Sequence, residues 1–314
     1  MEQNAKIFVT GHQGMVGSAI CNQLKKSGFD NLLVATRKQI DLTRQSIVEE
    51  FVKKESPDYM IIASAKVGGI HANSTYPAEF IRNNLQMTVN LIESARLANV
   101  KKLLFLGSSC IYPKMAKQPI TEDSLLSGPL EQTNQWYAIA KISGIKLCQA
   151  FREQYNFNAI AAMPTNLYGP NDNFHNENSH VIPALINRFH KAKLNNDPHV
   201  LAWGSGSPRR EFLHVEDLAK ALIFLLENYE ESIPINVGVG NDISIKELTE
   251  LVAKTVGYKG KIEWDRTKQD GTPKKLLDVS RINKLGWKAK KSLEDGLAET
   301  YQWYCDKDNN IRRK

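Results

Sequence analysis

The chain lacks any apolar run long enough to cross a membrane. None of its apolar stretches reaches the roughly 18 residues that a spanning helix needs. The first residues, Met1-Glu2-Gln3-Asn4-Ala5-Lys6, contain no apolar signal-peptide core and lead straight into a predicted strand. Over 314 residues, 42% hydrophobic and 24% charged side chains are ordinary for a globular chain with room for a second lobe. We therefore expect a cytoplasmic globular protein.

Cysteine is scarce, and its spacing argues against structural metal or disulfide sites. The four cysteines show no C-x-x-C spacing, so free thiols are expected. Six histidines lack the sequence spacing that is typical of metal ligands, so we predict that they bind no metal. The cysteines are Cys21, Cys110, Cys148 and Cys305, and these histidines are His12, His71, His175, His190, His199 and His214.

A basic tract of the kind that binds nucleic acid is also missing. The formal charge is +7, but the basic residues are spread along the chain, and the one compact run is Arg312-Arg313-Lys314. We interpret that run as a solvated end. A modest positive balance suits ligands that carry phosphates, and no internal repeat or low-complexity linker appears.

Alternating strand and helix patterns predict an α/β fold with a doubly wound parallel (Rossmann) sheet. Nearly continuous apolar runs are typical of buried parallel strands. The predicted strands cover 6–10, 31–36, 59–63, 102–106 and 158–163, and the predicted helices cover 15–24, 77–98 and 134–155.

The alternation ends after residue 170, where a stretch rich in Gly, Asn and His begins. Residues 212–217 are expected to return the chain to the main sheet before a helix that ends near Asn228. Ser244 and Glu247 have capping-box spacing and predict a helix to Val256. We expect a larger domain from residues 1–166 with a returning segment at 212–240. Residues 167–211 and 241–314 would form a smaller carboxyl-terminal α/β substrate lobe.

A glycine motif, Gly11-x-x-Gly14-x-x-Gly17, follows the first predicted strand and precedes a helix. Glycine permits a tight turn and lets backbone N–H groups approach a pyrophosphate at the positive end of the helix. The motif alone is weak, and a glycine-rich connection without a ligand is the alternative. Its place between strand and helix favours dinucleotide binding.

Tyr137 and Lys141 are four residues apart, downstream of Ser108. On a helix they share one face, so the ammonium can lower the phenol pKa from about 10 and relay protons from cofactor hydroxyls. Such pairs also occur by chance on helix surfaces. The glycine motif, Ser108 and the Tyr137–Lys141 pair follow one another along the chain, and together they indicate a nicotinamide redox enzyme.

The end of the second predicted strand bears on the type of nicotinamide cofactor. An acidic residue on the ribose hydroxyl is usual for NAD, whereas Thr36-Arg37-Lys38 stands here. A guanidinium at Arg37 would favour the extra phosphate of NADP, unless both cations are only solvated. Asp41 and Leu42 could border the adenine.

Six longer motifs resemble the GDP-L-fucose synthase family of extended short-chain dehydrogenases/reductases. The resemblance covers nearly the whole chain. The motifs are GHQGMVGS (11–18), AKVGGI (65–70), LGSSCIYP (106–113), PTNLYGP (164–170), NSHVIP (178–183) and REFLHV (210–215).

The resemblance implies a two-stage reaction on GDP-4-dehydro-6-deoxy-D-mannose. Epimerisation at carbons 3 and 5 of the sugar precedes NADPH-dependent reduction of the 4-ketone, which gives GDP-L-fucose. The ketone acidifies the protons on both neighbouring carbons, so an acid–base pair can move a proton from one face to the other. The same ketone then accepts the hydride.

The resemblance also implies residue roles. Ser108, Tyr137 and Lys141 form the reductase triad, and Cys110 and His180 carry epimerisation. Thiol and imidazole pKa values of about 8.5 and 6.5 suit proton exchange near neutrality. Without the family, Cys110 would be read as a buried hydrophobe and His180 as a loop residue.

The remaining site residues follow from the same resemblance. The substrate contacts are Arg188, Trp203, Arg210 and Asp270, whereas Arg209 is expected on the surface; a buried tryptophan and a solvated aspartate are the alternatives for Trp203 and Asp270. The cofactor contacts are Gly11, His12, Gln13, Gly14, Met15, Val16, Gly17, Arg37, Asp41, Leu42, Leu106, Gly107, Ser108, Ser109, Lys141, Pro164, Thr165, Asn166, Leu167 and His180.

Gln13 departs from the family pattern, because relatives can carry arginine there. NADP preference then depends more on Arg37, and use of NAD as well as NADP stays an alternative.

A 4-epimerase or 4,6-dehydratase with retained NAD is the alternative enzyme, although dehydratases usually carry an Asp-Glu pair where Ser109-Cys110 stands. A non-catalytic dinucleotide-sensing protein is a third interpretation.

Relatives usually dimerise, so we expect a homodimer formed by segments 77–98 and 134–155.

Overall fold

The structure is a computed structural model that describes residues 1–175, 179–268 and 270–306. The basic run Arg312-Arg313-Lys314 and the first residue of the NSHVIP motif lie outside the described residues. Within the described part of the chain, no helix is long and apolar enough to cross a membrane.

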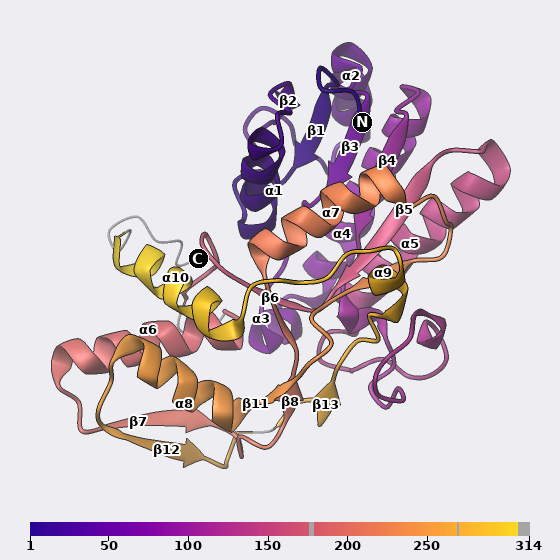
Figure 1. Ribbon diagram of the computed structural model, residues 1–314. Helices are drawn as coiled ribbons and strands as arrows, with labels where there is room; N and C mark the ends of the chain where they lie inside the picture. The colour runs from indigo at the N-terminus through magenta and orange to yellow at the C-terminus, as the bar shows by residue number, and fades with distance from the viewer. Residues whose placement is uncertain (176–178, 269, 307–314) are drawn as a thin grey trace.

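A six-stranded parallel sheet forms the centre of the larger part of the molecule (Figure 1). Its order is β10-β5-β4-β3-β1-β2, so the direction of winding reverses between β1 and β3. In doubly wound sheets, the carboxyl ends of the strands at such a reversal form a ligand-binding crevice. The strands are β1 (Ile7–Thr10), β2 (Leu32–Leu33), β3 (Tyr59–Ile62), β4 (Lys102–Leu106), β5 (Ala159–Pro164) and β10 (Ile235–Val237).

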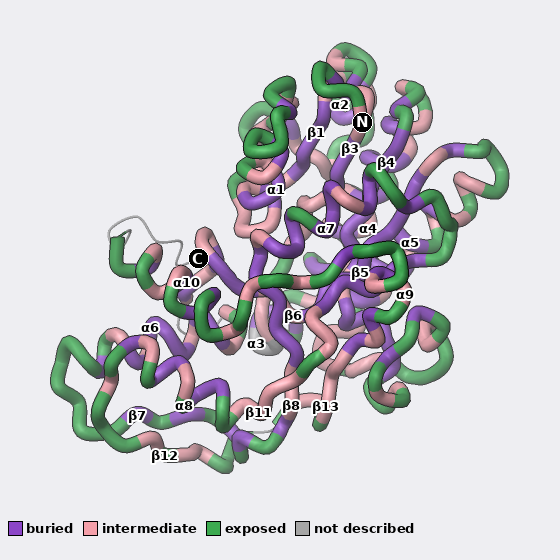
Figure 2. The backbone as a smooth tube through the Cα atoms, viewed as in Figure 1, coloured by how far each residue is buried: buried purple, intermediate pink, exposed green. Residues whose placement is uncertain are grey.

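Helices cover both faces of this sheet, as the doubly wound pattern requires. On one face α1 (Met15–Lys26) packs against α7 (Val215–Asn228). On the other face α4 (Pro77–Leu97) packs between α2 (Gln45–Glu55) and α5 (Gln135–Tyr155). The sheet strands run through the buried interior between these layers (Figure 2). The fold class expected from the sequence is confirmed.

A smaller lobe lies beside the carboxyl ends of the sheet (Figure 1). It contains a parallel pair of strands, β7 and β12, and a three-stranded sheet in the order β11-β8-β13. Its helices are α6 (Val181–Asn195), α8 (Ile245–Val256) and α10 (Leu293–Asp306), and its strands are β7 (His199–Trp203), β8 (Arg209–Arg210), β11 (Ile243–Ser244), β12 (Lys261–Asp265) and β13 (Lys274–Lys275).

The remaining elements are short and connect the two parts. They are the helices α3 (Ile70–Thr75) and α9 (Ser280–Lys284), the 3₁₀ turns η1 (Ser109–Ile111) and η2 (Glu122–Ser124), and the strands β6 (Asn166–Tyr168) and β9 (Phe212–His214).

The chain returns to the main sheet later than the sequence indicates. Residues 212–214 form β9, which pairs in parallel with β6 outside the main sheet. The return occurs at β10, which pairs with β5 after α7. The second strand is also shorter than expected, because its pairing with β1 is limited to Leu32 and Leu33 at the sheet edge.

The helix signals in the sequence are confirmed at residue level. The capping box is present, with Ser244 Oγ accepting from Glu247 N at 3.1 Å and the Glu247 carboxylate accepting from Ser244 N at 2.9 Å. The long helices predicted at 77–98 and 134–155 are α4 and α5. These elements place the active-site candidates on rigid supports.

Candidate functional site

The glycine motif forms a tight turn between β1 and α1. Gly11 has a φ of +72°, which favours glycine, and its carbonyl accepts from Gly14 N at 2.9 Å. A β-carbon on Gly17 would overlap the Gly11 carbonyl group. Gly14 precedes the helix and provides no side-chain cap, so the first N–H groups of α1 are free to bind an anion.

Ser108 and Cys110 follow β4 at the same edge of the sheet. Ser108 is the N-cap of η1, and its Oγ accepts from Cys110 N at 3.4 Å. The Cys110 side chain is only 8% exposed. The loop therefore holds a hydroxyl and a thiol next to each other at the end of a central strand.

Tyr137 and Lys141 occupy one face of α5, directly beside this loop. Gly144, one turn further on, lets α5 approach β4, because a β-carbon there would overlap the Phe105 ring. Lys141 is 3% exposed, and its Nζ donates to Leu106 O at 2.7 Å. The same Nζ lies 5.7 Å from the centroid of the Tyr137 ring. Helix and strand thus bring the expected triad and Cys110 together.

Burial controls the charges in this cluster. It lowers the pKa of Lys141 to about 8, with the neighbouring Cys110 acting in the opposite direction. Burial, and then Cys110, raise the pKa of the Tyr137 hydroxyl. The spacing of Tyr137 and Lys141 predicted a lowered Tyr137 pKa, whereas in this arrangement burial of the hydroxyl raises it. A Tyr137 phenol that stays protonated can act as a proton donor.

His180 comes from an element other than β4 and α5, which carry the buried cluster. It is exposed and precedes α6 as the N-cap residue, immediately after the segment 176–178 that is outside the described residues. Among the described groups, no side-chain hydrogen bond or ring contact joins His180 to Cys110. The structure places it at the start of the smaller lobe.

Two of the expected substrate residues stack in the smaller lobe. The Arg188 guanidinium lies 5.0 Å from the centroid of the exposed Trp203 ring and donates to Leu201 O at 2.6 Å. Burial lowers the pKa of Arg188. Trp203 is exposed, so the alternative of a buried tryptophan is wrong. A cation fixed beside an accessible aromatic face fits a planar or anionic ligand.

The other two expected substrate residues lie near each other at the lobe boundary. Asp270 is exposed but ordered, and it accepts from Ser205 N at 2.9 Å and from Ser205 Oγ at 2.6 Å. Burial lowers the pKa of Arg210, and Asp270 opposes this effect. Arg209 is partly exposed and pairs with Asp242 at 2.6 Å.

A small pocket opens beside Cys110 and contains groups that the sequence reasoning missed. Its walls include Glu131, Asn134, Thr272 and Lys275. Thr272 and Lys275 come soon after Asp270 in the chain, and this proximity is the signal that could have revealed them. β13 pairs Lys275 with Arg210 on β8, which joins this pocket to the smaller lobe.

The expected NADP-phosphate contacts are accessible. Gln13 and Arg37 are both exposed, at the ends of β1 and β2. Asp41 accepts from Thr43 Oγ1 at 2.7 Å, and hydrogen bonds from Thr43 are the main cause of its lowered pKa. Arg37 is exposed, and its charge contributes to the lowered pKa of Asp41.

The expected contacts after β5 lie at the same edge of the sheet. The Asn166 amide donates to Glu211 O at 2.7 Å, and Thr165 Oγ1 donates to the same oxygen at 3.3 Å. These bonds hold the loop that follows Pro164 against β9. Apart from Lys141 on α5 and His180 before α6, the expected cofactor residues come from the carboxyl ends of β1, β2, β4 and β5, where a doubly wound sheet binds its ligand.

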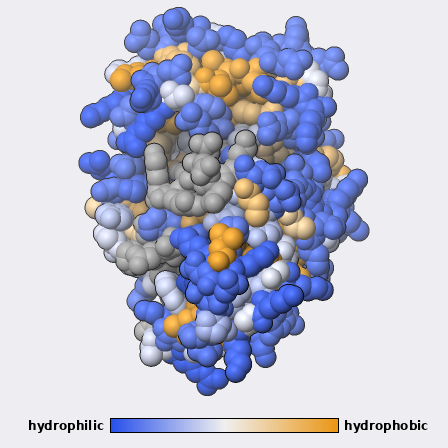
Figure 3. All heavy atoms as spheres, turned by 90° about the vertical axis from the view of Figure 1, so that its left-hand side faces the viewer, coloured by the Kyte–Doolittle hydropathy of each residue, from blue (hydrophilic) through white to orange (hydrophobic). Residues whose placement is uncertain are grey.

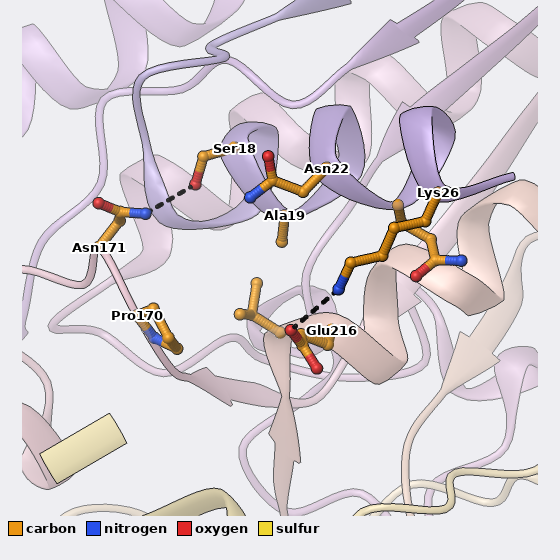
Figure 4. Close-up of a pocket in the computed structure, with 9 residues that line it drawn as sticks. Ser18, Ala19, Asn22, Lys26, Pro170, Asn171 and Glu216 are labelled. Atoms are coloured by element: carbon orange, nitrogen blue, oxygen red, sulfur yellow. Dashed lines mark hydrogen bonds and ion pairs between the residues drawn. The ribbon is translucent and has the colours of Figure 1, made fainter. Parts of the chain in front are cut away.

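A second pocket lies between α1 and the start of α7, as Figure 4 shows. Asn171 Nδ2 donates to Ser18 Oγ at 3.2 Å, and Lys26 faces Glu216 at 3.9 Å. None of the expected catalytic residues lines it. We assign it to the packing of these two helices.

Among the described residues, one group has the composition of a metal site. His214, Glu216 and Glu299 place their ligand atoms within 4.8 Å of one another. The Lys291 ammonium already pairs with both carboxylates, at 2.8 Å from Glu216. The half-buried Lys291 ammonium, paired with both carboxylates, supplies the positive charge that a metal would provide.

Comparison with known proteins adds a second line of observation. Residues 7–238 match the model of the "NAD dependent epimerase/dehydratase family". GDP-L-fucose synthase 1 of Arabidopsis thaliana is 60% identical over 303 residues, which cover 96% of this chain and 94% of that protein. GDP-L-colitose synthase of Yersinia pseudotuberculosis is 40% identical over 307 residues, covering 97% and 99%.

A solved structure supports the same relationship. The crystal structure of a GDP-L-fucose synthetase from Naegleria fowleri bound to NADP matches with a TM-score of 0.93 and 28% identity, over 100% of this chain and 98% of that one. The family match covers residues 7–238, which is most of the chain and includes the sheet, the glycine turn and the helix that carries Tyr137 and Lys141. The chain therefore belongs to the NAD dependent epimerase/dehydratase family, within the extended short-chain dehydrogenases/reductases.

Proposed function

We propose that the chain converts GDP-4-dehydro-6-deoxy-D-mannose to GDP-L-fucose. The reaction has two parts, 3,5-epimerisation of the sugar and NADPH-dependent reduction of its 4-ketone. The observation that carries the proposal is the joint placement of Cys110 with Ser108, Tyr137 and Lys141 at the end of β4. The name of the Arabidopsis relative, at 60% identity, supports the substrate.

The residues present fit a dinucleotide. Gly17 lets α1 start against the Gly11 carbonyl, where a β-carbon would not fit, and the uncapped N-terminus of α1 can present its N–H groups to a pyrophosphate. Arg37 would contact the extra phosphate, and Lys141 would hold the ribose. When bound, NADPH supplies a hydride to carbon 4 of the sugar. The NADP named in the Naegleria structure supports this assignment.

Epimerisation uses Cys110 and His180 as the acid–base pair. The Cys110 thiolate accepts the proton as the C–H bond next to the ketone breaks, and the electron pair moves onto the carbonyl oxygen. His180 returns a proton to the carbon from the opposite face, which inverts the centre. Ser108 donates a hydrogen bond to the carbonyl oxygen and stabilises the charge that develops there.

Reduction uses Tyr137 as the acid. Its phenol stays protonated because burial raises its pKa, and it donates that proton to the oxygen at carbon 4. Ser108 holds the same oxygen. Lys141 remains next to the Tyr137 ring as a buried cation and resupplies the proton through the ribose hydroxyls.

The substrate's nucleotide end fits the smaller lobe. Arg188 and Arg210 would bind the diphosphate or sugar, Trp203 offers an aromatic face, and Asp270 lies near Arg210. The Yersinia relative is named for a different GDP-sugar, which makes colitose synthesis the alternative within the family. The higher identity to the Arabidopsis protein favours fucose.

The experiment that tests the proposal separates it from a retained-NAD epimerase or dehydratase. Purified protein is denatured and its released nicotinamide is identified, and NADPH oxidation is then followed with the keto-sugar. We expect little bound NAD and one NADPH oxidised per GDP-L-fucose formed. Stoichiometric bound NAD with no net NADPH oxidation would instead favour the 4-epimerase or dehydratase. A protein without turnover of any keto-sugar would be a dinucleotide-sensing protein.

Arg37 is expected to set the preference for NADP. Arg37→Ala should raise KM for NADPH by roughly tenfold, since one charged hydrogen bond to a phosphate is lost, while KM for NADH stays unchanged. Lys38→Ala, one residue further on, is the matched control and should change little. Steady-state kinetics with both cofactors checks this. Equal losses with NADPH and NADH would contradict the assignment.

We also propose a homodimer formed through α4 and α5. These helices pack together and carry exposed apolar side chains, namely Val89, Leu97, Trp136 and Tyr155. The side that bears α1 and α10 is by contrast mostly hydrophilic (Figure 3). Light scattering should give about twice the 35.4 kDa chain mass, and Val89→Glu should shift it toward the monomer. A wild-type mass near 35.4 kDa at assay concentration would exclude the dimer.

The domain boundaries are proposed as residues 1–166 with 212–240 for the cofactor, and 167–211 with 241–314 for the substrate. Two separate clusters of buried hydrophobic residues support this division. The carboxyl-terminal segment crosses back over the cofactor domain, because the larger cluster includes Leu277, Val279, Ile282 and Trp287.

We place the enzyme in the cytoplasm, where its nucleotide-linked substrate and NADPH would be available.

A further inference from the structure

Lys275 is a half-buried lysine that the proposed mechanism does not use. It ends β13, and it lines the pocket that also contains Cys110. No hydrogen bond or ion pair of its ammonium is recorded among the described residues. A partly buried cation without a carboxylate partner is costly, so a nearby group that becomes anionic would stabilise it.

The backbone holds Lys275 in place from two sides. On one side β13 pairs in parallel with β8, where Arg209 N donates to Pro273 O at 2.8 Å. On the other side Leu276 N donates to Gln118 Oε1 at 2.9 Å, and Ile120 N donates to Leu276 O at 2.8 Å. Both Gln118 and Ile120 line the Cys110 pocket. The lysine is therefore presented to this pocket by a fixed strand.

A fully buried carboxylate locks the same strand. Glu211 is 0% exposed, and it accepts from Leu277 N at 3.1 Å and from Val239 N and Gly240 N at 2.6 and 2.7 Å. These bonds tie the residue two positions after Lys275 to the loop that follows β10. The position of Lys275 relative to the main sheet is thus fixed.

The charges around Lys275 direct it toward the thiol. Arg210, its register partner on β8, is a like charge that repels its ammonium. The other pocket lysines already have carboxylates, since Lys114 pairs with Glu131 at 2.8 Å and Lys274 with Asp242 at 2.9 Å. Lys275 has no such carboxylate partner among the described residues, and it shares the pocket with Cys110.

Charged and titratable groups approach the Cys110 thiol from several elements. Helix α5 contributes Tyr137 and Lys141, β13 contributes Lys274 and Lys275, and Ser108 is the N-cap of η1. The pocket walls add Tyr112, Lys114 and Glu131. Burial raises the pKa of Cys110, and Lys275 is the strongest of the groups that oppose this, ahead of Ser108 and Lys141. Lys141 also donates a hydrogen bond to Leu106 O, whereas no such bond of the Lys275 ammonium is found among the described residues.

We propose that Lys275 is the positioning residue that stabilises the thiolate of Cys110, keeping it available as the base of epimerisation. The inference deepens the proposed function and depends on it for the role of Cys110. In the step itself, the C–H bond of the sugar breaks, the proton goes to sulfur, and the electron pair goes to the carbonyl oxygen. Lys275 stays protonated throughout and exchanges no proton with the substrate.

The test measures the thiolate without substrate. Iodoacetamide alkylation of Cys110 is followed against pH by peptide mass spectrometry in the purified, full-length protein. Lys275→Met keeps the length of the side chain and removes the charge. We expect its alkylation curve to move to higher pH and its rate at pH 7 to fall about tenfold, because the thiolate fraction falls tenfold per pKa unit. Lys275→Arg should retain the wild-type curve.

Lys274→Met is the matched control, since it removes a neighbouring charge that Asp242 already balances. Its Cys110 curve should not move. An unchanged curve for Lys275→Met, or an equal shift for Lys275→Arg, would overturn the proposal. Buried Cys148 reports on folding in each sample, because it should stay unreactive in folded protein.

Solvent exchange into the keto-sugar separates this inference from the proposed function. Lys275→Met should slow deuterium exchange and shift its pH profile upward. A higher KM with an unchanged pH profile would make Lys275 a substrate contact and overturn the thiolate role. If the alkylation curve shifts but no protein, wild type included, exchanges the sugar protons, the proposed function fails while the Lys275–Cys110 interaction stands.

Discussion

Tyr137→Phe is expected to lower the rate of ketone reduction about a thousandfold and to leave proton exchange at carbons 3 and 5 nearly unchanged. The phenol is the acid for the oxygen at carbon 4, and the Phe ring keeps its packing against Phe80, at 6.5 Å between ring centroids. Deprotonation of the sugar carbons belongs to other residues. NADPH absorbance measures reduction, and NMR in heavy water measures exchange.

Tyr155→Phe, at the far end of the same helix, is the control and should reduce the ketone at the wild-type rate. Thermal unfolding of both variants establishes that they are folded. If Tyr137→Phe lost exchange as completely as reduction, the division of labour between Tyr137 and Cys110 would be incorrect.

Cys110→Ser is expected to show the reverse pattern, with exchange at carbons 3 and 5 lowered about a thousandfold. A serine hydroxyl has a pKa far above the roughly 8.5 of a thiol, so it supplies almost no base at neutral pH. The change of sulfur to oxygen is small, so the wall of the pocket is kept. Any remaining NADPH oxidation should yield an unepimerised 6-deoxy sugar, which NMR of the product identifies.

The exposed Cys305 offers the matched substitution, because Cys305→Ser removes a thiol from α10 without touching the pocket. It should exchange and reduce like wild type. Exchange in Cys110→Ser at more than about a tenth of the wild-type rate would remove Cys110 from the role of base.

The sequence could predict the parts of the fold that depend on local signals. The glycine turn, the capping box at Ser244 and the two long helices each have their determinants within a few neighbouring residues. The apolar runs predicted the central strands because buried parallel strands need apolar side chains on both faces. The cluster of Ser108, Cys110, Tyr137 and Lys141 followed from family motifs and from the spacing on one helix.

Long-range pairings could not be predicted in this way. β9 was expected in the main sheet, but it pairs with β6, and nothing within residues 212–217 specifies which strand they meet. Lys275 lies 165 positions after Cys110 in the numbering and reaches its pocket only because β13 pairs with β8. The raised pKa of Tyr137 depends on burial and then on the neighbouring Cys110, which the spacing of Tyr137 and Lys141 does not reveal.

The central claim is that one site both epimerises and reduces the sugar. The most direct measurement mixes the purified protein with GDP-4-dehydro-6-deoxy-D-mannose and NADPH in heavy water and identifies the product by NMR. We predict GDP-L-fucose with solvent deuterium at carbons 3 and 5. An unepimerised 6-deoxy sugar without deuterium at these carbons, or no consumption of NADPH, would contradict the account.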